Sequence, residues 1–305
     1  MTCVEVSPGV SLAYETFGDP ADLPVLLVSG FGSQMIAWHE DLCRALADRG
    51  RHVIRYDNRD CGLSTTFDDH PVDMGRFIAT VSSGDLASAR AMAPYTLQDM
   101  AADSLGLLTA LGLARAHVVG ASMGGAIAQK MALTQPSRVL TLTSMMSSTG
   151  EPAYGRSSPE AQAVLFAPKP TDREGYVAAA ERELVWASKR YGDPAPLREL
   201  AARSYDRAYY PAGIGRQLAA MVLDGSRADA LRTLRVPTLV IHGLDDTLIA
   251  PSGGERTAEL VPGARLLLLP DMGHDRPRPL WPEIIDAIQA HTAHTDRRHV
   301  PQRRP

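Results

Sequence analysis

The sequence contains few cysteines and no apolar run that approaches the length of a membrane span. Its three cysteines, Cys3, Cys43 and Cys61, are an odd number and lack the spacing of metal ligands. Free thiols in a reducing compartment explain this pattern best. A membrane span requires roughly 20 apolar residues, and the opening MTCVEVSPGV lacks the basic start and apolar block of a secretion signal. We therefore expect a cytoplasmic protein without stable membrane insertion.

The sequence also lacks a strong excess of charge and any repeat of fixed period. The formal net charge is −4 and the pI is near 6.1, which gives no reason to expect nucleic acid as a partner. The one basic run, DRRHVPQRRP, combines its charges with prolines at the end of the chain. We therefore interpret residues 294–305 as a flexible, solvated basic tail.

The sequence does contain apolar strands that alternate with amphipathic helices. Strands are buried apolar or β-branched runs, and helices begin at capping residues and end at glycines, as in the Thr96 to Asp99 signature. The expected strands are 10–18, 24–30, 52–58, 117–122, 139–145, 236–243 and 264–270. The expected helices are 35–50, 95–112, 123–136, 252–261 and 279–292. This alternation predicts right-handed βαβ units and a mostly parallel sheet, flanked by helices, in the α/β class.

Two segments interrupt the alternation. Residues 147–230 contain helical stretches but no convincing apolar strand, so we expect a helical cap inserted after the strand at 139–145. A second insertion, residues 67–94, separates a strand from its helix. The core would then comprise residues 1–146 and 231–293. Both insertions are expected at the carboxyl ends of the strands, where open α/β sheets bind ligands.

One short stretch, HVVGASMGG, places Ser122 in the pattern G-x-S-x-G at a strand-to-helix junction. The pattern alone is weak, because a chain of this length contains it by chance roughly one time in ten. Its position strengthens it, since a nucleophile elbow needs a strand before the serine and a helix after it. Gly120 and Gly124 would permit a strained bend that exposes the hydroxyl. The competing interpretation is a glycine-rich turn with an incidental serine.

A nucleophilic serine needs a base, and an elbow of this kind predicts the chain order serine, acid, histidine. His274 follows the last expected strand and precedes the last expected helix. Two carboxylates follow the strand before it, and we favour Asp246, three residues after Gly243, over the neighbouring Asp245. The C-terminal histidines are expected to be exposed: His291, His294 and His299.

An ester hydrolase also needs two donors for the negative oxygen that forms at the carbonyl. We expect the backbone N–H of Met123 and, from the loop SGFGSQM, the backbone N–H of Phe31. Gly30 and Gly32 would let that loop approach the substrate closely, although a merely flexible glycine-rich loop is the alternative. Met145 is a further candidate for substrate contact, and a plain core position fits it equally well.

The segments LLVSGFG, HVIRYDNRDCGLS, HVVGASMGG, VPTLVIHGLDD and LPDMGH resemble those of the α/β-hydrolase superfamily, and nearly the whole chain is covered. Within it, the chain is most similar to capped serine esterases, including the aclacinomycin methylesterase group and lipase-type carboxylesterases. The resemblance implies an α/β-hydrolase fold with Ser122 as nucleophile, Asp246 as acid and His274 as base. It also implies Phe31 and Met123 as oxyanion donors.

The resemblance has one departure. Ser29 stands where many relatives carry a histidine that supports the oxyanion loop, which puts the geometry of that loop in question. Cys61 lies in a loop near the expected site. A catalytic role for it is disfavoured, since its spacing suits a structural role in the loop and the serine already supplies a nucleophile.

We expect hydrolysis of a small-molecule carboxylic ester through an acyl-enzyme, without a metal or an organic cofactor. Epoxide hydrolases and haloalkane dehalogenases carry aspartate at the position of Ser122, which disfavours them. Thioesterases, perhydrolases and carbon–carbon bond hydrolases share the triad and stay open. A small-molecule receptor with this fold is the alternative from another class; such a receptor usually has a broken triad, whereas the expected triad is intact in this sequence. Substrate identity and oligomeric state, including a homodimer, are left open by the sequence.

Overall fold

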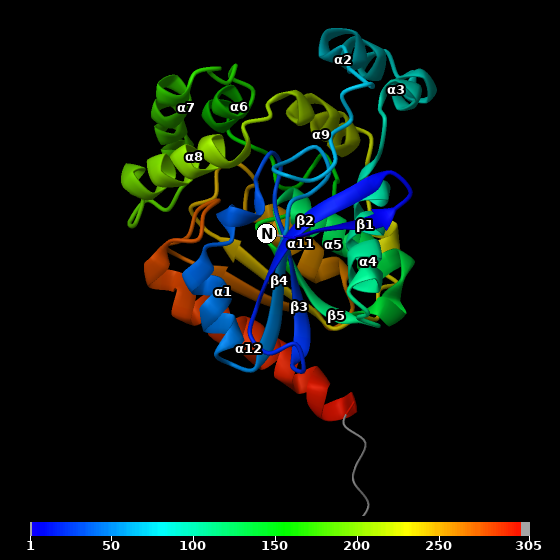
Figure 1. Cartoon of the computed structure of the whole chain (residues 1–305), viewed down its shortest axis with the longest axis vertical. Helices are drawn as coiled ribbons and strands as arrows, with labels where there is room; N and C mark the ends of the chain where they lie inside the picture. Colours follow the sequence, from blue (N-terminus) through cyan, green and yellow to red (C-terminus); the bar gives the residue numbers. More distant parts are fainter. Residues whose placement is uncertain (1, 300–305) are drawn as a thin grey trace, which may run out of the picture.

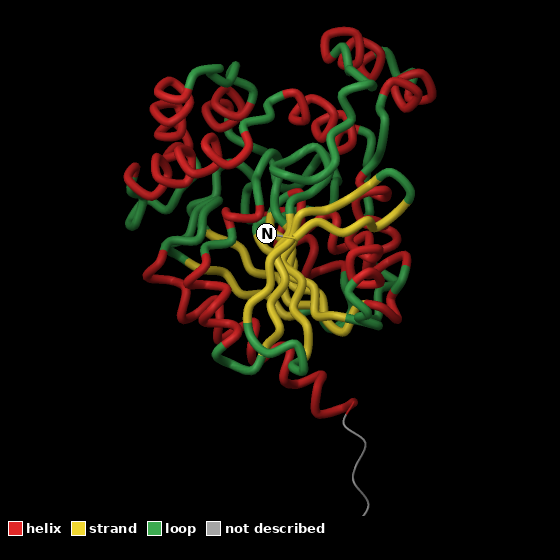
Figure 2. Tube along the Cα trace, viewed as in Figure 1, coloured by secondary structure: helices red, strands yellow, loops and turns green. Residues whose placement is uncertain are grey.

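An eight-stranded sheet forms the centre of the protein in a computed structural model that describes residues 2–299, and side chains as far as residue 293 (Figures 1 and 2). The strand order is β1-β2-β4-β3-β5-β6-β7-β8. β1 pairs antiparallel with β2, and β2 pairs antiparallel with β4. The other six strands, β3 to β8, run parallel to one another. The strands are β1 (Thr2–Ser7), β2 (Val10–Phe17), β3 (Leu23–Val28), β4 (Arg51–Tyr56), β5 (Ala116–Ala121), β6 (Val139–Met145), β7 (Thr238–Gly243) and β8 (Arg265–Leu269). The predicted, mostly parallel sheet is confirmed.

Helices cover both faces of the sheet. Successive side chains of a strand point to opposite faces, so Leu26 and Val28 of β3 join one core cluster while Val25 and Leu27 join the other. The first cluster contains residues of α4 (Leu97–Ala110), α5 (Met123–Thr134), α10 (Ala228–Leu231) and α11 (Ser252–Leu260). The second contains residues of α1 (Glu40–Ala47) and α12 (Trp281–His299). This three-layer packing explains why β4, β5, β6 and β7 are buried along their whole length.

Local capping residues set the bounds of two helices. α4 begins with the predicted capping box, in which the side chain of Thr96 accepts from the N–H of Asp99 and the Asp99 carboxylate accepts from the N–H of Thr96. The helix expected over 35–50 is interrupted. A 3₁₀ turn, η1 (Met35–Ala37), ends at Trp38 in extended conformation, and α1 then begins after His39, whose Nδ1 accepts from the N–H of Asp41.

Both predicted insertions are helical and lie at the same end of the sheet (Figure 1). The first contains α2 (Met74–Ser82) and α3 (Leu86–Met92). The second, residues 147–230, is called the cap below, and its helices are α6 (Pro159–Leu165), α7 (Arg173–Ala179), the 3₁₀ segment η3 (Ala180–Val185), α8 (Pro194–Ala208), α9 (Ala212–Val222) and the start of α10. In Figure 1, α9 lies between the group α6, α7, α8 and the pair α2, α3. The insertions therefore face the carboxyl ends of the parallel strands together.

The C-terminal region differs from the prediction. α12 continues to His299, so the expected tail is helical over residues 294–299, and residues 300–305 lie outside the described part of the chain. The expected exposure of His291 is wrong, because this residue is only 5% exposed and its Nε2 lies 3.2 Å from the carbonyl oxygen of Leu142. The side chains of His294 and His299 lie outside the described residues. None of the described helices is long and apolar enough to cross a membrane.

Candidate active site

Ser122 occupies a strained turn between β5 and α5. Its backbone adopts φ 56° and ψ −122°, a combination that a residue with a side chain adopts only when its surroundings enforce it. The N–H of Ser122 donates to the carbonyl oxygen of Met145 in the neighbouring strand β6, at 3.0 Å. The turn is therefore tied to the sheet, with the serine at the amino end of α5.

The two glycines of the G-x-S-x-G pattern are required by close backbone contacts. A methyl group at Gly120 would lie 2.1 Å from the carbonyl oxygen of Gly124. A methyl group at Gly124 would lie 2.2 Å from the carbonyl oxygen of Val28, at the end of β3. Glycine thus lets the strand, the helix and the adjacent strand end approach one another around the serine.

His274 and Asp246 are brought together by the loops after β8 and β7. The Nδ1 atom of His274 lies 2.7 Å from Oδ2 of Asp246, whose side chain is fully buried. The other oxygen, Oδ1, accepts from the N–H groups of Leu248 and Ile249 at 2.9 and 2.8 Å. Burial acts to raise the pKa of Asp246, but interactions with His274 and with the buried His242 outweigh it and lower the pKa to about 2. The carboxylate is thus held ionised against the imidazole.

Sequence reasoning missed one contact of this carboxylate. His242, at the end of β7, is fully buried, and its Nε2 lies 3.4 Å from Oδ2 of Asp246 while donating to the carbonyl oxygen of Ile249 at 2.8 Å. Asp245, the less favoured acid, instead accepts from the N–H of Lys189 in the cap and pairs with its ammonium group at 3.2 Å. The two adjacent aspartates therefore face different surroundings, and only Asp246 contacts His274.

The hydroxyl of Ser122 makes no hydrogen bond to any described residue, and Nε2 of His274 has no partner among them either. The Asp246 contact occupies Nδ1, so Nε2 is the nitrogen left to accept a proton. Bonds between a nucleophile and its base are often long without substrate and tighten when it binds.

The histidine loop is also fastened to the cap. The N–H of His274 donates to the carbonyl oxygen of Trp186 at 2.6 Å, and a methyl group at Gly273 would lie 2.3 Å from the same oxygen. The carboxylate of Asp275 accepts from the N–H groups of Ser188 and Gly273. On the cap side, these hydrogen bonds use the backbone carbonyl of Trp186 and the backbone N–H of Ser188. The side chains of the cap therefore gave no indication of them in the sequence.

One expected oxyanion donor, Met123, directly follows the serine, and the other, Phe31, belongs to the loop after β3. The N–H groups of Phe31 and Met123 donate to no acceptor in the described part of the chain. A methyl group at Gly30 would lie 3.3 Å from Cβ of Ser122, so the loop after β3 runs directly beside the serine. The N–H of Gly32, by contrast, is occupied: it donates to Oε1 of Gln217, a cap residue, at 2.9 Å.

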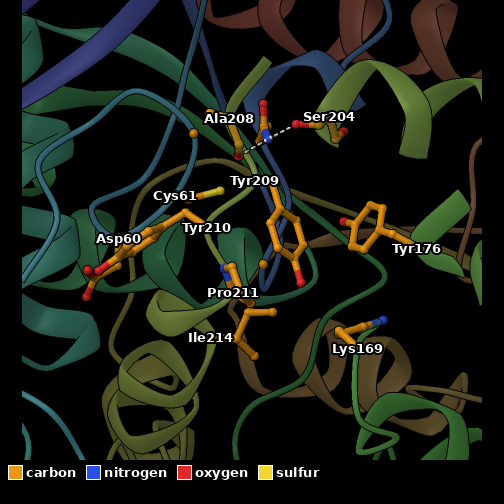
Figure 3. Close-up of a pocket in the computed structure, with 13 residues that line it drawn as sticks. Asp60, Cys61, Lys169, Tyr176, Ser204, Ala208, Tyr209, Tyr210, Pro211 and Ile214 are labelled. Carbon is orange, nitrogen blue, oxygen red and sulfur yellow. Dashed lines mark hydrogen bonds between the residues drawn. The ribbon is translucent and has the colours of Figure 1, made fainter. Parts of the chain in front are cut away.

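A pocket opens between this loop and the cap (Figure 3). Tyr176 and Tyr209 lie around the same opening as Lys169, with their ring centres 5.4 Å apart in an edge arrangement. Gly32 and Cys61 contribute from the core side. Burial raises the pKa of the Cys61 thiol, which disfavours the reactive thiolate. The aromatic and cationic lining of this pocket was not foreseen from the sequence.

Met145 does not contact this pocket. Its side chain is fully buried in the core cluster that includes Trp38, Leu239 and Ile241, so the prediction that it binds substrate is corrected. The residue serves the site through its backbone, whose carbonyl holds the N–H of Ser122. Among the described residues, no group of three or more His, Cys, Asp or Glu side chains is arranged to hold a metal ion.

A family model described as alpha/beta hydrolase fold matches residues 24–275. Rhodomycin D methylesterase DauP of Streptomyces sp. (strain C5) is 29% identical over 310 residues, covering 93% of this chain and 95% of that protein. The putative carbamate hydrolase RutD of Variovorax paradoxus (strain S110) is 28% identical, covering 86% and 89%. A hydrolase structure from Pseudomonas aeruginosa PA01 has a TM-score of 0.69 and 28% identity, covering 96% and 97%. The chain belongs to the alpha/beta hydrolase fold family.

Proposed function

We propose that this protein is a serine esterase that hydrolyses a carboxylic ester through a covalent acyl-enzyme. The observation that carries the proposal is the 2.7 Å contact between His274 and the buried carboxylate of Asp246, combined with Ser122 on its strained turn. Asp246 would orient the imidazole and stabilise its cation, and His274 would take the proton of the Ser122 hydroxyl.

In the first half of the reaction, Ser122 Oγ attacks the ester carbonyl as its proton moves to Nε2 of His274. The resulting oxyanion would accept from the N–H groups of Phe31 and Met123, which have no other acceptor in the described structure. The position of Met123 at the amino end of α5 adds a favourable dipole. His274 then protonates the departing alcohol, and water, activated by the same histidine, releases the acid.

The proposed substrate is an ester of an aromatic compound. Tyr176 and Tyr209 line the pocket beside the oxyanion loop, Tyr209 with one ring face stacked on Tyr205, and an aromatic group would pack favourably against such rings. Lys169, in the same pocket, lies 4.0 Å from the carboxylate of Glu183 and would favour a polar substituent that can accept a hydrogen bond from its ammonium group. The similarity to a rhodomycin D methylesterase makes a methyl ester the first alcohol portion to try.

The proposal is tested with Ser122→Ala, with the exposed Ser226 replaced by alanine as a control. With a p-nitrophenyl ester as substrate, Ser122→Ala should lower kcat by about 10⁴ or more, because the nucleophile is gone. Ser226→Ala should match the wild type. A fluorophosphonate probe should label the wild type and not Ser122→Ala.

Substrate class is tested by supplying an aromatic methyl ester, an aliphatic methyl ester and a thioester to the same enzyme. Preference for the aromatic ester supports the pocket assignment, whereas turnover of the thioester alone would make the protein a thioesterase. Labelling of Ser122 without turnover of any substrate would overturn the esterase proposal in favour of a binding protein.

A further inference from the structure

The loop that carries Phe31 has unusual backbone freedom. Gly30 and Gly32 stand on either side of Phe31, and Gly32 has φ +62°, in the region that favours glycine. If the Phe31 N–H is to serve the oxyanion, contacts must therefore fix the conformation of this loop. The buried hydroxyl of Ser29, at the start of the loop, has no hydrogen-bond partner in the described structure and supplies none of them.

Gln217 supplies a contact at the peptide that follows Phe31. This residue of α9 is 1% exposed, and both ends of its amide are used: Oε1 accepts from the N–H of Gly32 at 2.9 Å, and Nε2 donates to the carbonyl oxygen of Arg59 at 2.9 Å. The amide thus connects the oxyanion loop to the loop after β4. Rotation of either peptide would leave a buried polar group without a partner, which is unfavourable.

The helix that carries Gln217 is itself held firmly on the core. The preceding residue, Arg216, pairs with the fully buried carboxylate of Asp60 through two hydrogen bonds of 2.8 Å. At the start of α9, a methyl group on Gly213 would lie 2.0 Å from the carbonyl oxygen of Asp60. α9 therefore cannot shift without breaking a buried ion pair, and Gln217 is a fixed reference for the loop.

We propose that Gln217 is a positioning residue for the reaction: it holds the peptide after Phe31 so that the Phe31 N–H points at the developing oxyanion. This inference rests on the proposed esterase function. The cap would then help to stabilise the transition state through Gln217, in addition to lining the pocket. Gln217 acts through the loop and need not touch the substrate.

The test replaces Gln217 by methionine, which preserves length and shape but neither donates nor accepts strongly. The expected loss in kcat is on the order of tenfold to a hundredfold, since misplacing one oxyanion donor costs part of what removing it costs. KM should change little. Affinity for a trifluoromethyl ketone analogue of the ester, which forms an oxyanion adduct, should fall by the same factor as kcat.

The matched control is Gln129→Met. Gln129 is also fully buried, and its amide donates to Ser144 Oγ and accepts from Arg227 Nε, yet it contacts no residue of the oxyanion loop. This variant should lose similar thermal stability while keeping the wild-type kcat per folded molecule. If Gln217→Met fails to fold, Gln217→Asn keeps the amide but shortens its reach by one carbon, and should show the same loss in kcat.

The inference is overturned if kcat and analogue affinity of the Gln217 variants stay within about threefold of the wild type. It is also overturned if Gln129→Met loses as much kcat. Failure of the esterase function itself would appear separately, as a wild-type enzyme whose turnover is insensitive to Ser122→Ala.

Discussion

Replacement of Asp246 by asparagine should separate the role of this carboxylate in catalysis from its role in stability. Asparagine is nearly isosteric and can still accept from the N–H groups of Leu248 and Ile249. Toward His274, however, it carries no charge and can present an NH₂ group that favours the wrong imidazole tautomer. We expect kcat for ester hydrolysis to fall by about 10⁴ with KM little changed.

The effect on stability follows from the lowered pKa of Asp246. A shift from 3.8 in the unfolded chain to about 2 in the folded protein corresponds to about 2 kcal/mol of stability. Because the folded value is the lower one, this contribution is fully present above about pH 4. It is lost as the pH falls through about 2. Urea unfolding of the wild type and of Asp246→Asn should therefore differ by about 2 kcal/mol at neutral pH, and the difference should shrink as acid is added.

The neighbouring aspartate is the matched control. Asp245 pairs with Lys189, whose side chain is 76% exposed, so Asp245→Asn should change stability by less than about 1 kcal/mol and leave kcat nearly unaltered. The reasoning is refuted if Asp245→Asn lowers kcat more than Asp246→Asn does. A stability difference that stays constant from neutral pH into acid would refute the linkage argument alone.

Two further predictions concern the packing around the site. Gly124→Ala would place a methyl group 2.2 Å from the carbonyl oxygen of Val28 and should lower the free energy of unfolding by about 1–3 kcal/mol or more in thermal melts. Gly75→Ala, inside α2 and without a close contact, should be neutral or stabilising, and equal losses in both variants would contradict the packing argument. Arg216→Gln leaves the buried Asp60 carboxylate without its cation and should cost about 3–5 kcal/mol in urea unfolding. Arg173→Gln, which breaks the exposed pair with Asp206, should cost less than about 1 kcal/mol, and a comparable loss there would argue against burial as the cause.

Much of the core could be predicted because its determinants are local. The Thr96–Asp99 capping box needs only residues three apart, and the turn at Ser122 needs only glycines two positions away on either side. Alternating apolar runs likewise specify buried parallel strands without knowledge of their partners. The positions of Asp246 and His274 after successive strands follow from the order of elements. Local patterns therefore located the residues of the candidate triad, while their catalytic roles stay predictions.

The contacts that were missed all join distant segments. Gln217 meets Gly32 across 185 positions, and nothing about a glutamine in a helix indicates that it faces inward. His291 was expected to be exposed near the end of a polar terminal helix, yet it faces β6, where its Nε2 lies 3.2 Å from the carbonyl oxygen of Leu142. Two aspartates of the loop after β4 are paired with arginines of two cap helices, Asp57 with Arg207 of α8 and Asp60 with Arg216 of α9. Such pairs become visible only when tertiary packing is known.

The cap contributes to the candidate site in two ways: some of its residues contact the loops of the core, and others line the pocket. The backbone carbonyl of Trp186 holds the loop that carries His274, and the side-chain amide of Gln217 holds the loop that carries Phe31. The pocket side chains Lys169 and Tyr176 form no hydrogen bond with either loop in the described structure. Side chains of the pocket can therefore be substituted without breaking the contacts that hold either loop. The contacts that hold the two loops constrain only the cap backbone and a few buried polar side chains, whereas the residues that line the pocket are free to vary. This explains why the sequence of the cap does not indicate which substrate it would bind.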